Sequence, residues 1–471
     1  MLHRIVLATR NLPGISMVYR GIYRRSAEFA ARSLASIPGV EGVSLHRGMT
    51  RPGWEPGVSD IDLVIRGNAS AYGAVLSRAQ SLRAFIPMLG DLWIGEDSEY
   101  RNYARWGGNR VAEDLALWKP LAGSGPVSTD LPGSSENKVK RAALDPWVWS
   151  FTAYVEASRR VLCGGGVVGE KDLADLRKAS ADTVRLAHGS KLREIDRTAS
   201  VDQLWLSAAL SLSEFSRSVL NRTADGTSPL TLPEPRDVEE RSRLNVLLDG
   251  PVRGVVFDPP YHTYLILEED ASEADFKEAA RIAVERSPGG VPLILTPSSW
   301  ELCLQGSYLG APLGAFGKYG KPGGLFGDGG PRVVGSVNGA VRRLPLKLRW
   351  EIAAEAASWM LLWRRPLWGD ANSGNQFVLF HLFTRAAGLR LALEGEEVPF
   401  WDWDALMKRS AEIFPEEADL YESLERYSAE EPEEAVNGLP RERLDPSLER
   451  GLDILFDRIS KRLELCQSES P

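Results

Sequence analysis

Two aspartates separated by a single apolar residue, Asp60 and Asp62, have the spacing that most clearly indicates chemistry. They border an apolar run that predicts a β-strand. Because strand side chains alternate between two faces, both carboxylates are expected on one face, and Ile61, Leu63 and Ile65 are expected in a core. Adjacent carboxylates repel each other, and a hard divalent cation relieves that repulsion. Mg²⁺ is commonly held by one or two carboxylates together with substrate phosphates.

A glycine turn precedes this acid pair. Gly48 follows a short predicted strand and lies twelve residues before Asp60. The backbone amides of Gly48 and Met49 can bind phosphate in such a turn. Ser59 adds a hydroxyl directly beside the first aspartate. The turn and the acid pair together predict a metal–phosphate site.

The order of elements around this site resembles that of a known superfamily. A helix is predicted from Val18 to Ser36, followed by a turn, a strand, the glycine, a loop and the strand with Asp-x-Asp. This order resembles the DNA polymerase β-like nucleotidyltransferases over about residues 15–110. The resemblance implies transfer of a nucleoside monophosphate from a nucleoside triphosphate to a hydroxyl group. It implies two Mg²⁺ ions, for which Mn²⁺ can substitute, held by the motif aspartates.

One position departs from the superfamily pattern. The serine that usually follows the glycine is Met49 here, and a methionine side chain donates no hydrogen bond. The amides of Gly48 and Met49 remain available, and either Ser59 or Thr50 is expected to supply the missing hydroxyl.

The superfamily usually has a third carboxylate on a later strand. Asn68 to Ser70 can cap a helix that runs to about Arg83, and the next strand-like run contains Asp91. A charged residue inside an apolar run needs a functional or structural reason, so we assign Asp91 as the third acid. The resemblance implies that Asp91 helps to hold the second Mg²⁺ ion and orients or deprotonates the acceptor hydroxyl. Glu96 and Asp97 are the rivals, although they follow Gly95 and are more typical of a loop.

Several other segments have two interpretations each. The arginines and aromatic residues of Tyr100 to Arg110 either lie beside a nucleotide or cover the sheet edge. The glycine-rich residues 306–339 are either a surface loop or a lid. His46 and His381 are more typical of core histidines than of ligands. Three acids lie close together at the end of a predicted helix, and they are more typical of solvated surface residues than of a catalytic base. They are Glu394, Glu396 and Glu397.

Composition excludes several classes of protein. The chain has 471 residues, 43% hydrophobic and 25% charged, which is typical of globular proteins and long enough for about three domains. A net charge of −8 argues against bulk nucleic-acid binding. Three dispersed cysteines and the lack of a long apolar run predict a cytoplasmic protein with reduced thiols and no membrane partner.

The pattern predicts an α/β (α+β) nucleotidyltransferase core with a short mixed sheet, followed by largely helical regions and a small α/β insertion. No internal repeat is evident. The helical part loosely resembles the acceptor-binding domain of aminoglycoside adenylyltransferases. The expected divisions are a catalytic domain 1–120, a linker 121–139, a helical region 140–249, a small α/β unit with the glycine-rich loop 250–345 and a helical domain 346–471.

Two functions follow from these residues. The first is a Mg²⁺-dependent nucleotidyltransferase, whose acceptor is a small hydroxylated molecule, a protein side chain or an RNA end. The second is a binding or regulatory protein built on a degenerate domain of the same shape, such as an antitoxin or a scaffold. Met49 favours the second function, and retention of Asp60 and Asp62 favours the first.

Overall fold

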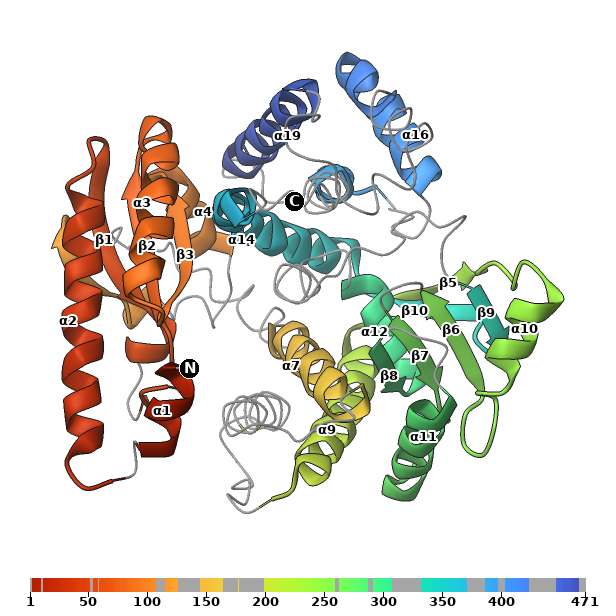
Figure 1. Ribbon diagram of the computed structural model, residues 1–471. Coiled ribbons are helices and arrows are strands. Elements are labelled where there is room, and N and C mark those ends of the chain that lie inside the picture. The colour runs from red at the N-terminus through yellow and green to blue at the C-terminus, as the bar shows by residue number, and fades with distance from the viewer. Residues whose placement is uncertain are drawn as a thin grey trace. The chain divides into compact units, whose positions relative to one another are not determined.

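The computed structural model describes fourteen stretches of the chain, and all structural statements concern these residues (Figure 1). The described residues are 2–9, 12–50, 54–57, 59–106, 115–125, 145–163, 177, 199–258, 262–286, 291–306, 332–370, 386–396, 403–422 and 446–465. None of the helices in these stretches is both long enough and apolar enough to cross a membrane.

The chain forms two compact units, each assembled from separate segments. The first unit contains residues 1–139, 354–373 and 456–470. The second contains residues 140–353 and 374–455, together with Pro471. Both units mix helices with small sheets, as the sequence predicts for an α+β protein.

The first unit contains one four-stranded sheet with helices on both faces. Its elements are α1 (Leu2–Thr9), α2 (Ile15–Ala35), β1 (Val40–His46), η1 (Arg47–Thr50), β2 (Ile61–Gly67), η2 (Ala69–Ala71), α3 (Tyr72–Phe85), β3 (Leu89–Gly95), α4 (Asp97–Trp106) and β4 (Lys119–Gly123), with the later parts of α14 (Leu346–Asp370) and α19 (Pro446–Leu465).

The strand order in this sheet is β3-β2-β1-β4. β1 pairs antiparallel with both β2 and β4, whereas β2 and β3 are parallel. A parallel pair needs a crossover connection, and α3 provides it. The first residues of β2 and β3 therefore lie at the same edge of the sheet.

Both faces of this sheet are buried. On one face, Ile61, Leu63 and Ile65 pack with apolar residues of α2 and α3, as the alternation in the sequence predicts. On the other face, Val64 and Trp93 pack with residues that include Tyr100 and Tyr103 of α4, Trp118 and Leu362 of α14. Two-sided burial places the polar residues of β2 and β3 at the ends of the strands.

The second unit contains a four-stranded sheet and a two-stranded sheet. Its elements are α7 (Asp145–Leu162), α9 (Val201–Thr223), β5 (Gly226–Leu230), α10 (Val238–Asn245), β6 (Gly254–Asp258), β7 (His262–Ile266), α11 (Glu273–Arg286), β8 (Val291–Leu295), α12 (Pro297–Gly306), β9 (Arg332–Gly335), β10 (Gly339–Arg343), the start of α14, α16 (Trp403–Ile413), η5 (Pro415–Glu417) and the start of α19.

Local capping signals account for the starts of two helices in this unit, α9 and α11. Ser200 accepts a hydrogen bond from the amide of Gln203, whose side chain accepts one from the amide of Ser200, so a capping box begins α9. Ser272 and Asp275 make the same reciprocal pair at the start of α11. The larger sheet has the order β8-β7-β6-β9, and β5 pairs separately with β10.

The observed elements agree with most of the predicted ones. The helix expected from Val18 to Ser36 is α2, and the strand expected around Asp91 is β3. Asn68 precedes η2 but makes no side-chain cap to its backbone; instead the Ser70 hydroxyl donates to Asn68 Oδ1. Residues 121–123, at the start of the expected linker, belong to β4, and most of residues 124–139 lie outside the described part of the chain.

Candidate functional site

The predicted acids lie where β2 and β3 begin. Asp62 is the second residue of β2, and Asp60 comes immediately before that strand. Asp91 is the third residue of β3. Because these strands are parallel neighbours, all three aspartates belong to the same edge of the sheet.

Both motif aspartates converge on Gly90. A Cβ atom added to Gly90 would lie 2.5 Å from Asp62 Oδ1 and 2.8 Å from Asp60 Cβ. The backbone of β3 can therefore approach both side chains only because residue 90 is a glycine. Gly90 was not among the residues predicted from the sequence, although a glycine inside a strand pattern typically marks a bulge or a close backbone approach.

An irregularity in the pairing of β2 and β3 lies at this point. Ile61 is opposite Leu89, but Leu63 is opposite Leu92, so β3 contains one extra residue between these pairs. Bulges re-aim side chains and occur often near active sites. Here the extra residue allows the Asp91 amide to donate a 3.0 Å hydrogen bond to Asp62 Oδ1.

Arg83, at the end of α3, also contacts the irregular segment. Its Nη2 donates to the carbonyl oxygen of Gly90 at 3.1 Å. This bond ties α3 to the strand segment against which Asp60 and Asp62 lie. Arg83 is half-buried, and its cationic side chain lies beside a segment that carries several carboxylates.

The glycine turn contacts the residue before the acid pair. A Cβ atom on Gly48 would lie 3.1 Å from Ser59 Cβ and 3.5 Å from Ser59 Oγ. The structure therefore brings together two predicted phosphate-binding residues that are separated by ten positions in the sequence. Ser59 is half-buried, and its amide donates to the carbonyl of Glu55 at 2.9 Å, which closes the turn before Asp60.

Met49 has its side chain in the core. It is 5% exposed and belongs to the hydrophobic cluster formed by β1, β2, β3, α2 and α3. Only its backbone could contact a ligand at the glycine turn. Thr50 is also buried at 5% exposure, so Ser59 is the better placed of the two hydroxyl groups predicted to replace the superfamily serine.

Tyr23 of α2 anchors the loop that precedes Asp60. Its hydroxyl oxygen accepts a 2.9 Å hydrogen bond from the amide of Gly57, whose φ is +84°. Burial raises the pKa of Tyr23, the Gly57 amide lowers it, and the charge of Asp60 raises it. The Tyr23 phenol is therefore neutral at physiological pH. No local sequence pattern singles out Tyr23 for this role, because its hydrogen bond to Gly57 joins residues 34 positions apart.

His46 is the register partner of Asp62 across the β1–β2 ladder. Its side chain is fully buried, with its ring centroid 4.6 Å from that of Trp93 and 6.0 Å from that of Trp118. The structure thus places His46 both next to an acid of the motif and within an aromatic cluster.

The two rivals of Asp91 lie at the far end of β3. Asp97 receives hydrogen bonds of 2.7 and 3.1 Å from the buried guanidinium of Arg66. Glu96 Oε1 accepts a 3.2 Å bond from the amide of Ala69. At about 3.3 Å per residue, the five steps from Asp91 to Glu96 span about 17 Å, and Asp97 follows Glu96 as the first residue of α4. They are placed to stabilise the fold at that end of the sheet.

The donor chemistry of the acid edge fits Mg²⁺. Asp60 and Asp62 provide hard carboxylate oxygens, and a hydrogen bond from the Asp91 amide orients one carboxylate. In the part of the chain that the structure describes, no group of three or more His, Cys, Asp or Glu residues is placed to hold a metal ion. An ion at this edge would therefore depend on the phosphate oxygens of a bound nucleotide for the rest of its ligands.

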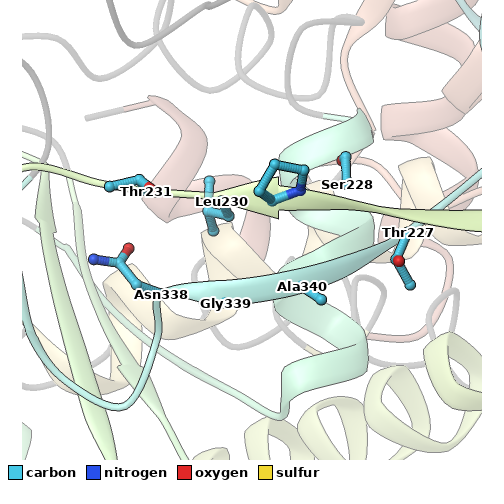
Figure 2. Close-up of a pocket in the computed structure, with 8 residues that line it drawn as sticks. Thr227, Ser228, Leu230, Thr231, Asn338, Gly339 and Ala340 are labelled. Carbon is cyan, nitrogen blue, oxygen red and sulfur yellow. The ribbon is translucent and has the colours of Figure 1, made fainter.

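A separate hollow of about 550 Å³ is lined by residues of the paired strands β5 and β10 and their neighbours (Figure 2). It offers hydroxyl, amide and backbone groups but no acid or base, so it has no group for proton transfer. It contains none of the predicted site residues. The lining residues are Thr227, Ser228, Pro229, Leu230, Thr231, Asn338, Gly339 and Ala340.

The remaining sequence candidates have structural contacts or lie outside the described residues. Tyr100 and Tyr103 of α4 cover the sheet face, and Glu396 forms an ion pair of 2.6 Å with Arg409. Glu394 is exposed. His381, Glu397, residues 107–110 and most of the glycine-rich segment lie outside the described residues.

The chain was compared with known proteins at three levels. No family model, no curated protein and no solved structure matches it.

Proposed function

We propose that the protein is a Mg²⁺-dependent nucleotidyltransferase that moves a nucleoside monophosphate from a nucleoside triphosphate to a hydroxyl-bearing acceptor. The observation that carries this proposal is the convergence of Asp60 and Asp62 on Gly90 at the edge that also contains Asp91. The contact between Gly48 and Ser59 adds a phosphate-binding turn to the acid edge.

Each residue has a distinct role in the proposed reaction. Asp60 and Asp62 would hold the metal, and the amides of Gly48 and Met49 with the Ser59 hydroxyl would bind phosphate oxygens. Mg²⁺, when bound, supplies positive charge that stabilises the phosphoryl oxygens. Asp91 would accept the proton of the acceptor hydroxyl. The acceptor oxygen forms a bond to the α-phosphorus as the bond to pyrophosphate breaks, and pyrophosphate leaves.

A transfer assay tests this proposal directly. The protein would be incubated with Mg²⁺ and each labelled nucleoside triphosphate, together with candidate small-molecule, protein and RNA acceptors. We expect pyrophosphate release and a labelled product that Asp60→Asn/Asp62→Asn abolishes. Glu96→Gln is the matched control, because Glu96 is an acid that directly follows β3 at the other end of the same sheet and should retain wild-type activity.

A non-catalytic binding or regulatory protein of the same shape is the second candidate. Met49 favours this second candidate. The superfamily usually has a serine at this position, whereas the Met49 side chain lies in the core and offers no hydroxyl to a phosphate. This candidate predicts that no nucleoside triphosphate is turned over with any acceptor. Nucleotide binding without turnover would support it over the enzyme.

A further inference from the structure

We infer that the β6–β9 sheet of the second unit is a second copy of the β1–β4 fold, and that this copy lacks the acid edge. The two regions share their strand order, their strand directions and the geometry of one glycine-serine turn. They differ at the end of the sheet where the first copy carries its aspartates.

The two sheets have the same topology. In each, two successive antiparallel strands are followed by a helix and by a third strand parallel to the second. The crossover helices, α3 and α11, each contain 14 residues. A 10-residue helix follows in both, α4 or α12, and a fourth strand then pairs antiparallel with the first. The corresponding orders are β3-β2-β1-β4 and β8-β7-β6-β9.

A matching turn ends the fourth strand of each sheet. In the first copy Gly123 has φ +70° and is opposite Gly42, and the Ser124 amide donates to the Glu41 carbonyl at 2.9 Å. A Cβ atom on Gly123 would come within 2.9 Å of Gly42 Cα and would also collide with the Glu41 carbonyl oxygen.

The second copy repeats this arrangement residue by residue. Gly335 has φ +79° and is opposite Gly254, and the Ser336 amide donates to the Arg253 carbonyl at 2.9 Å. A Cβ atom on Gly335 would come within 3.0 Å of Gly254 Cα and would collide with the Arg253 carbonyl oxygen.

Topology alone does not require this turn. An antiparallel strand can end in many conformations, and a left-handed glycine facing a second glycine is one specific solution. Its occurrence at the same ladder position in both sheets indicates a copied unit. The short sequences around the paired glycines also agree, because Val40-Glu41-Gly42-Val43 corresponds to Val252-Arg253-Gly254-Val255.

The copies differ where the first one carries its acids. His46 and Asp62 form the last ladder pair of β1 and β2, and Asp258 and His262 form the last pair of β6 and β7. Fifteen residues separate His46 from Asp62 in the sequence, whereas three separate Asp258 from His262. The second copy therefore has no room for a glycine turn followed by an acid-bearing loop.

The residues at the corresponding positions confirm this difference in chemistry. Counting back along β7 from its pairing with Gly254, His262 corresponds to Asp62. Val291 of β8 is the neighbour of His262 at this edge. At these described positions the second copy has an imidazole, a valine and the single carboxylate of Asp258, so the paired carboxylates that would hold Mg²⁺ in the first copy are absent from them. If the proposed function holds, on which this consequence rests, each chain binds one metal–nucleotide and not two.

Hydrogen exchange on the full-length protein tests the repeat independently of any activity. In the wild type, the amides of Ser124 and Ser336 are both expected to be protected. Gly123→Ala should speed exchange by roughly tenfold in residues 40–46 and 119–124 alone, because alanine is disfavoured in the left-handed region. Gly335→Ala should do the same in residues 252–258 and 332–336 alone.

Two matched glycines serve as controls. A Cβ atom on Gly73 or on Gly226 would meet no atom within 4 Å, so Gly73→Ala and Gly226→Ala should leave both turns protected. An unprotected Ser336 amide in the wild type, or a Gly335→Ala variant with unchanged exchange, would overturn the repeat. The wild-type measurement decides this even if an alanine variant does not fold.

Calorimetric titration tests the loss of the acid edge. With Mg²⁺ and each ribonucleoside triphosphate in turn, we expect a stoichiometry of one per chain, and none for Asp60→Asn/Asp62→Asn. Two bound nucleotides, or a site that survives in the double variant, would show that the second copy binds nucleotide and would overturn this part of the inference. A wild-type protein that binds none of the ribonucleoside triphosphates would contradict the proposed function. Hydrogen exchange would still test whether the second sheet is a copy of the first.

Discussion

The amide of Asp91 donates a 3.0 Å hydrogen bond to Asp62 Oδ1, which links two parallel strands at the edge where both begin. The donor is a backbone group, so this bond orients the Asp62 carboxylate without using the Asp91 side chain. The side chain of Asp91 can therefore have a separate role, and the two contributions can be separated by mutation.

Gly90→Ala is expected to abolish metal-dependent nucleotide binding. The new Cβ atom would lie 2.5 Å from Asp62 Oδ1 and 2.8 Å from Asp60 Cβ, so both acids must move. Isothermal titration with Mg²⁺ and a nucleoside triphosphate measures the effect. Gly73→Ala is the control, because that glycine is in α3 with open space around it. Wild-type affinity in Gly90→Ala would show that the ligand does not depend on these carboxylates.

Asp60→Asn combined with Asp62→Asn should remove nucleotide binding without unfolding the protein. Both residues are half-buried at the edge of the sheet and lie outside its hydrophobic clusters. Replacing two neighbouring carboxylates with amides also removes their mutual repulsion. Thermal unfolding without metal should therefore occur at the wild-type temperature or above it. A large decrease in that temperature would indicate a structural role for the pair.

Asp91→Ala is expected to keep most of the nucleotide affinity and to lose transfer. The backbone hydrogen bond to Asp62 survives this change, because alanine retains the amide. General acid–base groups typically contribute about 10²- to 10⁴-fold to the rate. Single-turnover kinetics with saturating nucleotide would measure the loss. Wild-type turnover would exclude Asp91 as the proton acceptor.

Met49→Ser should destabilise the first unit and should not strengthen nucleotide binding. The residue is 5% exposed within the core, so serine would leave a cavity and bury a hydroxyl. Comparable truncations of buried methionine to alanine cost about 2–5 kcal/mol. Chemical denaturation would measure the change in free energy of unfolding, with Met49→Leu as the control expected to cost less than about 1.5 kcal/mol. Tighter nucleotide binding by Met49→Ser would mean that the side chain can turn toward the ligand.

The sequence was sufficient for features that depend on local periodicity. The alternation from Asp60 to Ile65 predicted a strand with its apolar residues in a core, and Ile61, Leu63 and Ile65 are in that core. The helical spacing of α2 was equally informative, because an apolar stripe of period 3.6 is encoded within one segment. Periodicity does not distinguish among Asp91, Glu96 and Asp97, because all three lie in or near one strand.

Tertiary structure alone decided the features that depend on contacts between distant segments. The approach of Gly90 to both aspartates needs the parallel pairing of β2 and β3 and the extra residue in β3, and neither is encoded in a local pattern. The burial of Met49 depends on α2 and α3 closing over the same face of the sheet. The second copy of the fold shares few residues with the first, so only strand order, register and the paired glycines reveal it. Side-chain alternation is a property of one strand, whereas strand pairing is a property of several strands. For this reason the sequence was enough to predict the candidate acids, and only the tertiary structure shows which backbone segments lie against them.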